Sequence, residues 1–470
     1  MFAFKKVLTN SGYLLGFRIL SRLLSVIFLI YAASHLRPAL FGAFSFVLIT
    51  VELLGSISDL GITRYGSREL IRKTGDRPIL AGQILVLQIV TSLPMALAGL
   101  AVVLFFNPGY PKTQLLLIGM ASFFLYSVIN TTEAIFTSAE RFFYSAGLAF
   151  TGRLIYTIMG ISALVFGYSV IVVMWAFFVA IIVEVALRMI VVTRKITSFS
   201  FHFNSVAVWR LLVLSMPFAI AGIANIVALR INVMILEFFK GDAAVGVYNI
   251  AFTLFTPFVW VPYILSLATF PGLTEAYMKD HNLARREFWQ WYRIMSLVGI
   301  PAALGITLLA SPALSHFPAG YRGSSTVLIV LAWQAPFMLF TSVGYNILQI
   351  SDHERSLALS LTIGAVATAI FSFILIPFFG ELGAAFAALL AVAVKQFHIQ
   401  YEIYHRALRK RAMRLFVSPA IGGAVMVVLA LLISRMNVWI AVVVGFVAYL
   451  LTVLLTGAVR VSEIKTMIRI

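Results

Sequence analysis

The sequence contains no cysteine and few charged residues. Its 470 residues include no cysteine, which excludes disulfide bonds, thiol nucleophiles and cysteine-ligated metals. Charged residues make up only 11% of the chain, whereas 61% of the residues are hydrophobic. Soluble proteins are typically about 45–50% apolar. We therefore expect a membrane protein with many transmembrane segments.

Acidic residues are scarce relative to basic residues. The chain has 17 Asp and Glu residues against 35 Lys and Arg residues, which gives a formal net charge of +18. Such a surplus can bind nucleic acid, but no stretch is long and polar enough to form a soluble domain that holds a basic patch. The surplus is instead typical of the cytoplasmic loops of membrane proteins. We expect no nucleic-acid partner.

Catalytic signatures are also missing. The 7 histidines are scattered without metal-ligand spacing, and the chain has no phosphate-binding loop or hydrolase nucleophile elbow. A membrane glycosyltransferase usually needs large external loops, which this chain lacks. We therefore expect no catalytic residues, no cofactor and no metal site. Because Lys5 and Lys6 precede an apolar run longer than that of a signal peptide, the first run is expected to stay as a helix.

Apolar runs of the length that a bilayer requires recur along the whole chain, which predicts an all-α integral membrane protein with about 14 transmembrane helices. Short turn-like segments rich in Gly, Pro and Asn separate them. The predicted spans cover approximately residues 10–36, 40–62, 78–106, 112–138, 145–167, 169–192, 208–236, 243–272, 289–312, 323–350, 355–378, 382–404, 416–434 and 437–458.

The distribution of Lys and Arg predicts the orientation of these spans. With the N-terminus in the cytoplasm, most of the 35 basic residues fall in cytoplasmic segments, among them the basic stretch after the second span at residues 64–77. We therefore expect both termini in the cytoplasm and an even number of spans. The basic residues expected outside are Arg37, Lys112, Lys240, Arg322 and Arg435.

A short repeated pattern suggests two related halves. LFGAFSF at residues 40–46 and AVGVYNI at residues 244–250 share an apolar-Gly-small-aromatic order. Each copy follows an arginine inside an apolar run and precedes another span, as internal repeats of transporters do. We therefore predict six spans in residues 1–195, six in residues 196–408, and two additional spans in residues 409–470.

Charged residues inside the predicted spans are the candidate site residues. Arg18 and Arg22 lie one helical turn apart in the first span, where hydrocarbon would reject both. They either extend to the headgroups or line a wet cavity. The neighbouring residues Glu184 and Arg188 are expected to pair with each other. The other candidates either face a cavity or form buried pairs: they are Glu52, Glu133, Arg230 and Lys395.

Several of these features together resemble one family. The arginine-bearing first run, the LFGAFSF turn, the SDLGITRYGSREL segment at residues 58–70 and the number of spans are similar to the polysaccharide flippases. These are the O-antigen and capsular repeat-unit flippases of the multidrug, oligosaccharidyl-lipid and polysaccharide exporter superfamily. The resemblance implies two six-helix lobes around a central cavity, which is cationic in flippases of lipid-linked sugars, and transport by alternating access.

The resemblance also implies roles for the charged residues. Arg18 and Arg22 fit the substrate-binding cations of the first helix, and Arg230 fits a counterpart in the second lobe. Lys395 is the fourth candidate for substrate binding, although no local motif anchors it. The candidates for H⁺ or Na⁺ coupling are Glu52 and Glu133.

The implied function is translocation of a lipid-linked oligosaccharide, carried on an isoprenoid pyrophosphate, across the cytoplasmic membrane for surface polysaccharide biosynthesis. The partners implied are this cargo, membrane lipids, H⁺ or Na⁺, and polysaccharide-assembly proteins. Three alternatives stay open: a cation-coupled multidrug exporter, a peptidoglycan-precursor flippase and a membrane glycosyltransferase. An exporter of cationic drugs would need an acidic cavity, whereas the deep charges here are mostly positive.

Overall fold

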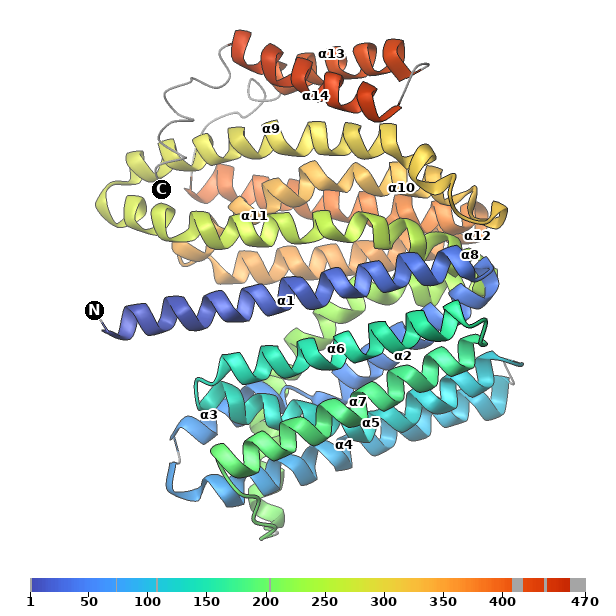
Figure 1. Ribbon diagram of the computed structural model, residues 1–470. Helices are drawn as coiled ribbons and strands as arrows, with labels where there is room; N and C mark the ends of the chain where they lie inside the picture. The colour runs from blue at the N-terminus through green and yellow to red at the C-terminus, as the bar shows by residue number, and fades with distance from the viewer. Residues whose placement is uncertain are drawn as a thin grey trace. The chain divides into compact units, whose positions relative to one another are not determined.

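The computed structural model describes residues 2–72, 74–106, 109–202, 204–407, 417–434 and 438–456, and this part of the chain is helical without any strand (Figure 1). The predicted fold class, an all-α integral membrane protein, is confirmed. A helix satisfies its own backbone hydrogen bonds, which is required of a segment that crosses lipid.

The chain divides into two compact units, Met1–Arg230 and Ile231–Ile470. The boundary falls inside the long helix α8, and the lobe boundary predicted at residue 195 stays a prediction. The helices of the first unit are α1 (Phe2–His35), α2 (Pro38–Asp59), α3 (Ile62–Arg72), α4 (Arg77–Phe106), α5 (Lys112–Ser138), α6 (Phe142–Val165), α7 (Val170–Lys195) and the first part of α8 (Ser205–Lys279).

The second unit begins with the rest of α8. Its remaining helices are α9 (His281–Leu314), α10 (Ser324–Ala332), α11 (Gln334–Ile350), α12 (Glu354–Glu402), α13 (Val417–Ser434) and α14 (Val438–Leu455). Two of the long helices are broken at a glycine with positive φ, Gly241 in α8 (φ 74°) and Gly380 in α12 (φ 57°). Glycine adopts such a conformation without the steric cost that a Cβ would add.

The described residues contain 10 helices that are long and apolar enough to cross a membrane. Because the breaks at Gly241 and Gly380 divide two of them, each of these can supply two spans. The helices α13 and α14 are also apolar and have 18 residues each. These segments together approach the number of spans that the sequence predicts.

Packing within the first unit brings distant segments together. Helix α1 runs alongside α6 (Figure 1), and Phe28 of α1 packs against Tyr156 of α6 with ring centroids 4.5 Å apart. At the far end of the unit, a core cluster joins α3, α4, α5 and α7 to the start of α8 through Tyr65, Phe136 and Leu211. This cluster explains why the first part of α8 belongs to the first unit.

The second unit is built around α9, α11 and α12. Phe288, Tyr292, Val343 and Ile399 form its main cluster of buried side chains. Helices α13 and α14 lie side by side and pack onto α9 (Figure 1). Tyr449 of α14 fixes this contact, because its hydroxyl donates to the Leu297 carbonyl oxygen of α9 at 2.9 Å.

Candidate functional site

Arg18 and Arg22 of α1 are both exposed, although α1 from Gly16 to His35 has the length and hydropathy of a membrane span. Arg22 interacts electrostatically with four charged side chains of the first unit: Glu52, Arg18, Arg153 and Arg230. The two predicted arginines of α1 therefore belong to a larger group of charges. We call Arg18, Arg22, Arg153 and Arg230 the arginine cluster.

Glu52 of α2 is the acidic member of this region. Its Oε2 accepts a hydrogen bond from Arg230 Nη2 at 2.8 Å, across 178 residues of sequence. The pair is open, because 50% of the Glu52 side chain and 23% of the Arg230 side chain are exposed. The bond thus joins Arg230, the last residue of the first unit, to α2, and its predicted place in the second lobe stays a prediction.

Arg153 was missed by sequence analysis. It lies in the interior of α6, and its guanidinium carbon lies 5.9 Å from the centroid of the Tyr156 ring. The predicted span began three residues later than α6 does, which placed Arg153 close enough to a helix end to seem peripheral. Arg153 lies as deep in its predicted span as Arg18 lies in the first span. This depth could have identified Arg153 as a candidate.

The arginine cluster has an excess of positive charge. Among the described side chains, the charges that act on Arg22 are those of three other arginines and a single carboxylate, Glu52. Each guanidinium has five N–H donors in a planar fork, which suits phosphate oxygens. Exposed arginines within membrane spans are costly in hydrocarbon. The arrangement can therefore bind an anion in a water-accessible space.

Glu133 has a different environment. Its carboxylate accepts hydrogen bonds from Ser145 Oγ at 2.7 Å and from Arg188 Nη1 at 3.1 Å. Arg188 Nε also donates to Glu184 Oε1 at 2.8 Å, so the predicted pair of Glu184 and Arg188 is confirmed. We call Glu133, Arg188 and Glu184 the Arg188 triad.

The guanidinium of the Arg188 triad is buried between α5, α6 and α7, and its two carboxylates are partly exposed. Only 3% of the Arg188 side chain is exposed, and Arg188 Nη2 donates to the Ser145 carbonyl oxygen at 3.2 Å. Gly152 of α6 leaves the space that Glu184 occupies, because a Cβ there would collide with the Glu184 carboxylate. The geometry is that of a satisfied structural ion pair, with two carboxylates on one guanidinium.

Lys395 belongs to the second unit, on the second arm of α12. Its ammonium nitrogen lies 5.9 Å from the centroid of the Tyr345 ring, and its alkyl chain packs against Gly364 of the first arm. Three of the four predicted substrate-binding cations therefore gather in the first unit, and Lys395 has its own surroundings in the second.

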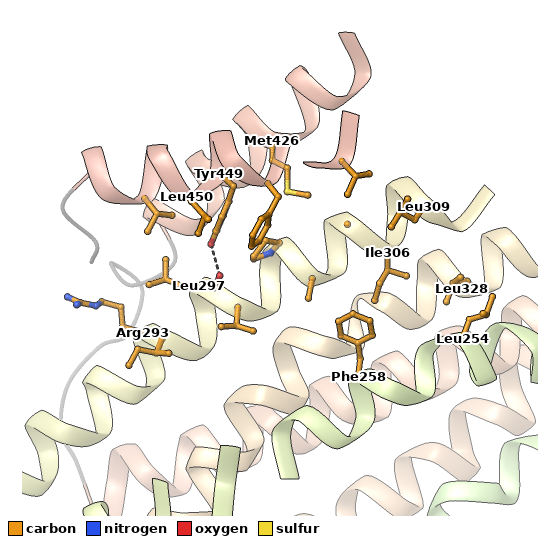
Figure 2. Close-up of a pocket in the computed structure, with 18 of the residues that line it drawn as sticks. Leu254, Phe258, Arg293, Leu297, Ile306, Leu309, Leu328, Met426, Tyr449 and Leu450 are labelled. Carbon is orange, nitrogen blue, oxygen red and sulfur yellow. Dashed lines mark hydrogen bonds between the residues drawn. The ribbon is translucent and has the colours of Figure 1, made fainter. Parts of the chain in front are cut away.

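A large apolar pocket lies within the second unit (Figure 2). Its volume is about 700 Å³, and its walls come from α8, α9, α10, α13 and α14. Phe258, Ile306 and Met426 are among the apolar residues that line it, and Arg293 lies at one end beside Leu297. A pocket with such walls can hold a hydrocarbon chain. Among the described residues, no group of His, Asp and Glu could hold a metal ion.

Comparisons with known proteins give consistent results. A family described as "Polysaccharide biosynthesis protein" matches residues 7–277. The probable flippase AglR of Haloferax volcanii is 25% identical over 197 residues, which are 41% of this chain and 40% of that protein. An uncharacterized membrane protein of Methanocaldococcus jannaschii is 29% identical over 154 residues, which are 32% of this chain and 30% of that protein. The match thus spans less than half of either relative.

Solved structures share the fold. The lipid II flippase MurJ in an inward closed conformation matches with a TM-score of 0.77 and 14% identity, covering 93% of this chain and 98% of that chain. An inward-facing multidrug resistance transporter of the MATE family matches with a TM-score of 0.63 and 14% identity, covering 86% of this chain and 94% of that chain. At these identities the likeness concerns the fold alone.

Proposed function

Because this chain belongs to the polysaccharide biosynthesis protein family, we propose that it is a flippase that moves an isoprenoid pyrophosphate-linked oligosaccharide across the cytoplasmic membrane. The observation that carries the proposal is the arginine cluster around Glu52. A pyrophosphate head is an anion with several oxygens, and a guanidinium can bind two of them at once. Arg18, Arg22 and Arg230 bind this head in the proposal, and Arg153 joins them.

The apolar pocket supports a lipid-linked cargo. An isoprenoid chain is a long hydrocarbon that must leave the aqueous path taken by the sugar. The pocket lined by Phe258, Ile306 and Met426 provides apolar walls for part of this chain. The second unit by itself thus offers apolar walls to a hydrocarbon, and the first unit by itself offers cations to a pyrophosphate.

Glu52 supplies a route to ion coupling. Glu52 holds Arg230 through the bond of 2.8 Å. In the proposal, H⁺ or Na⁺ binds the carboxylate in competition with Arg230, and the Arg230 guanidinium then turns to the cargo phosphate. Glu133, the other candidate, already binds Arg188 and Ser145. We therefore favour Glu52 over Glu133 for coupling, and Lys395 remains a proposed contact for the glycan or its phosphate.

The other function classes fit less well. An exporter of cationic drugs would bring its substrate against four arginines, which would repel it. A flippase for a peptidoglycan precursor shares the proposed chemistry, since that cargo also has an isoprenoid pyrophosphate. The glycan decides between the two.

The proposed cargo is tested by binding to the purified protein. Undecaprenyl pyrophosphate linked to a short glycan is titrated while native mass spectrometry counts bound cargo, with a cationic dye as the competing class. We expect the anionic lipid to bind and the dye not to bind. Binding of the dye together with no binding of the lipid would reject the flippase and favour the drug exporter.

The orientation, with both termini in the cytoplasm, is tested by labelling. Because the chain has no cysteine, single cysteines can be introduced without a background. In intact cells, an impermeant maleimide should label Tyr110→Cys and should leave Arg72→Cys unlabelled. The reverse labelling pattern would show that the termini lie outside the cytoplasm. The proposed direction of transport would then also be reversed.

A further inference from the structure

A second polar pocket lies in the first unit, away from any residue used in the proposed transport. Its volume is about 290 Å³, and it lies where α4 begins, where α5 turns into α6 and where α7 ends. Three cations line it: Arg77, Arg141 and Lys195. Glu140 is the single acidic residue of its lining, so positive charge exceeds negative charge.

The three cations keep donors for a ligand. Arg77 Nε donates to the Leu70 carbonyl oxygen at 3.4 Å, and Lys195 Nζ donates to Tyr144 Oη at 2.9 Å. These bonds hold the two side chains at the pocket, but each uses only one N–H. A guanidinium has five donors and an ammonium has three. Arg141 is exposed, so its side chain can reach a ligand at the pocket mouth.

The turn that forms one wall has an unusual backbone. Glu140 has a φ of 55°, a left-handed conformation that glycine and asparagine adopt more readily than glutamate. The turn places Glu140 and Arg141 next to each other in the pocket lining. A residue held in such a conformation is a reason to examine the site for function.

The position of the pocket indicates the ligand. All the lining residues lie at the ends of membrane-spanning helices, on the side where the basic residues predict the cytoplasm. Phospholipid phosphates lie at this depth, and basic pockets between such helices bind anionic headgroups. We infer that Arg77, Arg141 and Lys195 form a binding site for a phosphate group at the cytoplasmic surface of the first unit.

Two sources can supply this phosphate: the headgroup of an anionic phospholipid, or a soluble phosphate ion. The inference does not depend on the proposed cargo, because neither source carries a glycan or an isoprenoid. It therefore stands or falls separately from the flippase. In either case Glu140 opposes the ligand, since its carboxylate is the negative charge of the lining.

The test is lipid binding to the purified full-length protein, counted by native mass spectrometry. The probes are phosphatidylglycerol, the zwitterionic phosphatidylcholine as a control, and inorganic phosphate as a competitor. The variant that removes the site is Arg77→Gln, Arg141→Gln, Lys195→Gln. Its matched control, Arg64→Gln, Arg68→Gln, Arg72→Gln, removes three exposed cations of α3 outside the pocket.

We expect the pocket variant to bind phosphatidylglycerol at least about tenfold more weakly, since one lost charge-assisted hydrogen bond already corresponds to that factor. The control variant should keep most of the binding. Competition by inorganic phosphate would identify a soluble phosphate as the source, and lack of competition would identify the lipid headgroup. Equal losses in the two triple variants, or no loss in the pocket variant, would overturn the inference.

A single substitution gives a second test that does not risk the fold. Glu140→Gln removes the opposing charge and keeps the shape of the side chain, so phosphatidylglycerol should bind more tightly. Arg141→Gln, at an exposed position, should weaken the same binding. Unchanged or weaker binding by Glu140→Gln would contradict the site even if the triple variant were poorly folded.

Discussion

The arginine cluster and the Arg188 triad contain the same residue types in opposite balance. In the arginine cluster, four guanidinium groups interact with one another and with Glu52 as their single carboxylate, and the bond between Glu52 and Arg230 is partly exposed. In the Arg188 triad, two carboxylates share one guanidinium that is 3% exposed. The first has positive charge to offer to a ligand. In the second, both carboxylates bind the one guanidinium, so Arg188 has no positive charge to offer to a ligand.

This difference separates function from stability in one unit. Ion pairs deep in a membrane protein can serve either purpose, and the residue type does not tell them apart. The exposure of the side chains and the ratio of guanidinium groups to carboxylates distinguish the two purposes. We therefore expect substitutions in the arginine cluster to change cargo binding more than folding, and substitutions in the Arg188 triad to do the reverse.

The largest expected effect is on folding, from Arg188→Met. This change leaves Glu184 and the partly exposed Glu133 without their cation, and breaking a buried pair in this way costs about 3–5 kcal/mol. We expect a strong loss of folded protein, measured by fluorescence-detected size exclusion and thermal unfolding. A well-folded Arg188→Met variant that had lost transport would show that the Arg188 triad has a functional role. The triad would then not differ from the arginine cluster in this respect.

The next effect is on cargo affinity, from Arg22→Gln or Arg230→Gln. Each loses a charge-assisted hydrogen bond worth about 1.5–3 kcal/mol, which corresponds to roughly 10- to 150-fold weaker cargo binding. Lysine should rescue only in part, because it keeps the charge but lacks the bidentate fork. If the arginines only extend to the headgroups, lysine would be fully equivalent.

A double variant tests the contribution of the first helix as a whole. The Arg18→Gln, Arg22→Gln double variant is compared with wild type for expression and for export of the lipid-linked glycan. Normal export by a well-expressed double variant would remove α1 from the binding site and leave Arg230 and Arg153 to carry the proposal.

The helices and many of the charged residues in this contrast were predictable from sequence. The partners that the charged residues bind across the fold were not. The length of the apolar runs predicts the helices, and charges inside them predict Arg18, Arg22 and the local pair of Glu184 and Arg188. Contacts across many residues leave no such pattern in one sequence. The bond between Glu52 and Arg230 spans 178 residues, and the bond between Glu133 and Arg188 spans 55.

A smaller effect is expected for Glu133→Gln. The amide keeps the shape of the side chain and retains contact with Ser145 and Arg188, but it loses the negative charge opposite Arg188. We expect a loss of about 1–3 kcal/mol in the free energy of unfolding. The pH and Na⁺ dependence of transport should stay unchanged. Loss of that dependence in a stable variant would instead make Glu133 the coupling site.

The smallest effect on stability, and the sharpest on coupling, is expected for Glu52→Gln. Partly exposed ion pairs contribute only about 0–1 kcal/mol, so the protein should fold normally. The neutral amide keeps the shape of the side chain but lacks the charge that attracts Arg230, so more of the positive charge of the arginine cluster acts on the cargo. Cargo should then bind more tightly to Glu52→Gln than to wild type, and transport by Glu52→Gln should no longer depend on a gradient of H⁺ or Na⁺. The measurement is cargo affinity, and transport with and without these gradients, with Glu133→Gln as the matched control. A gradient dependence that persists in Glu52→Gln would show that this carboxylate does not couple transport.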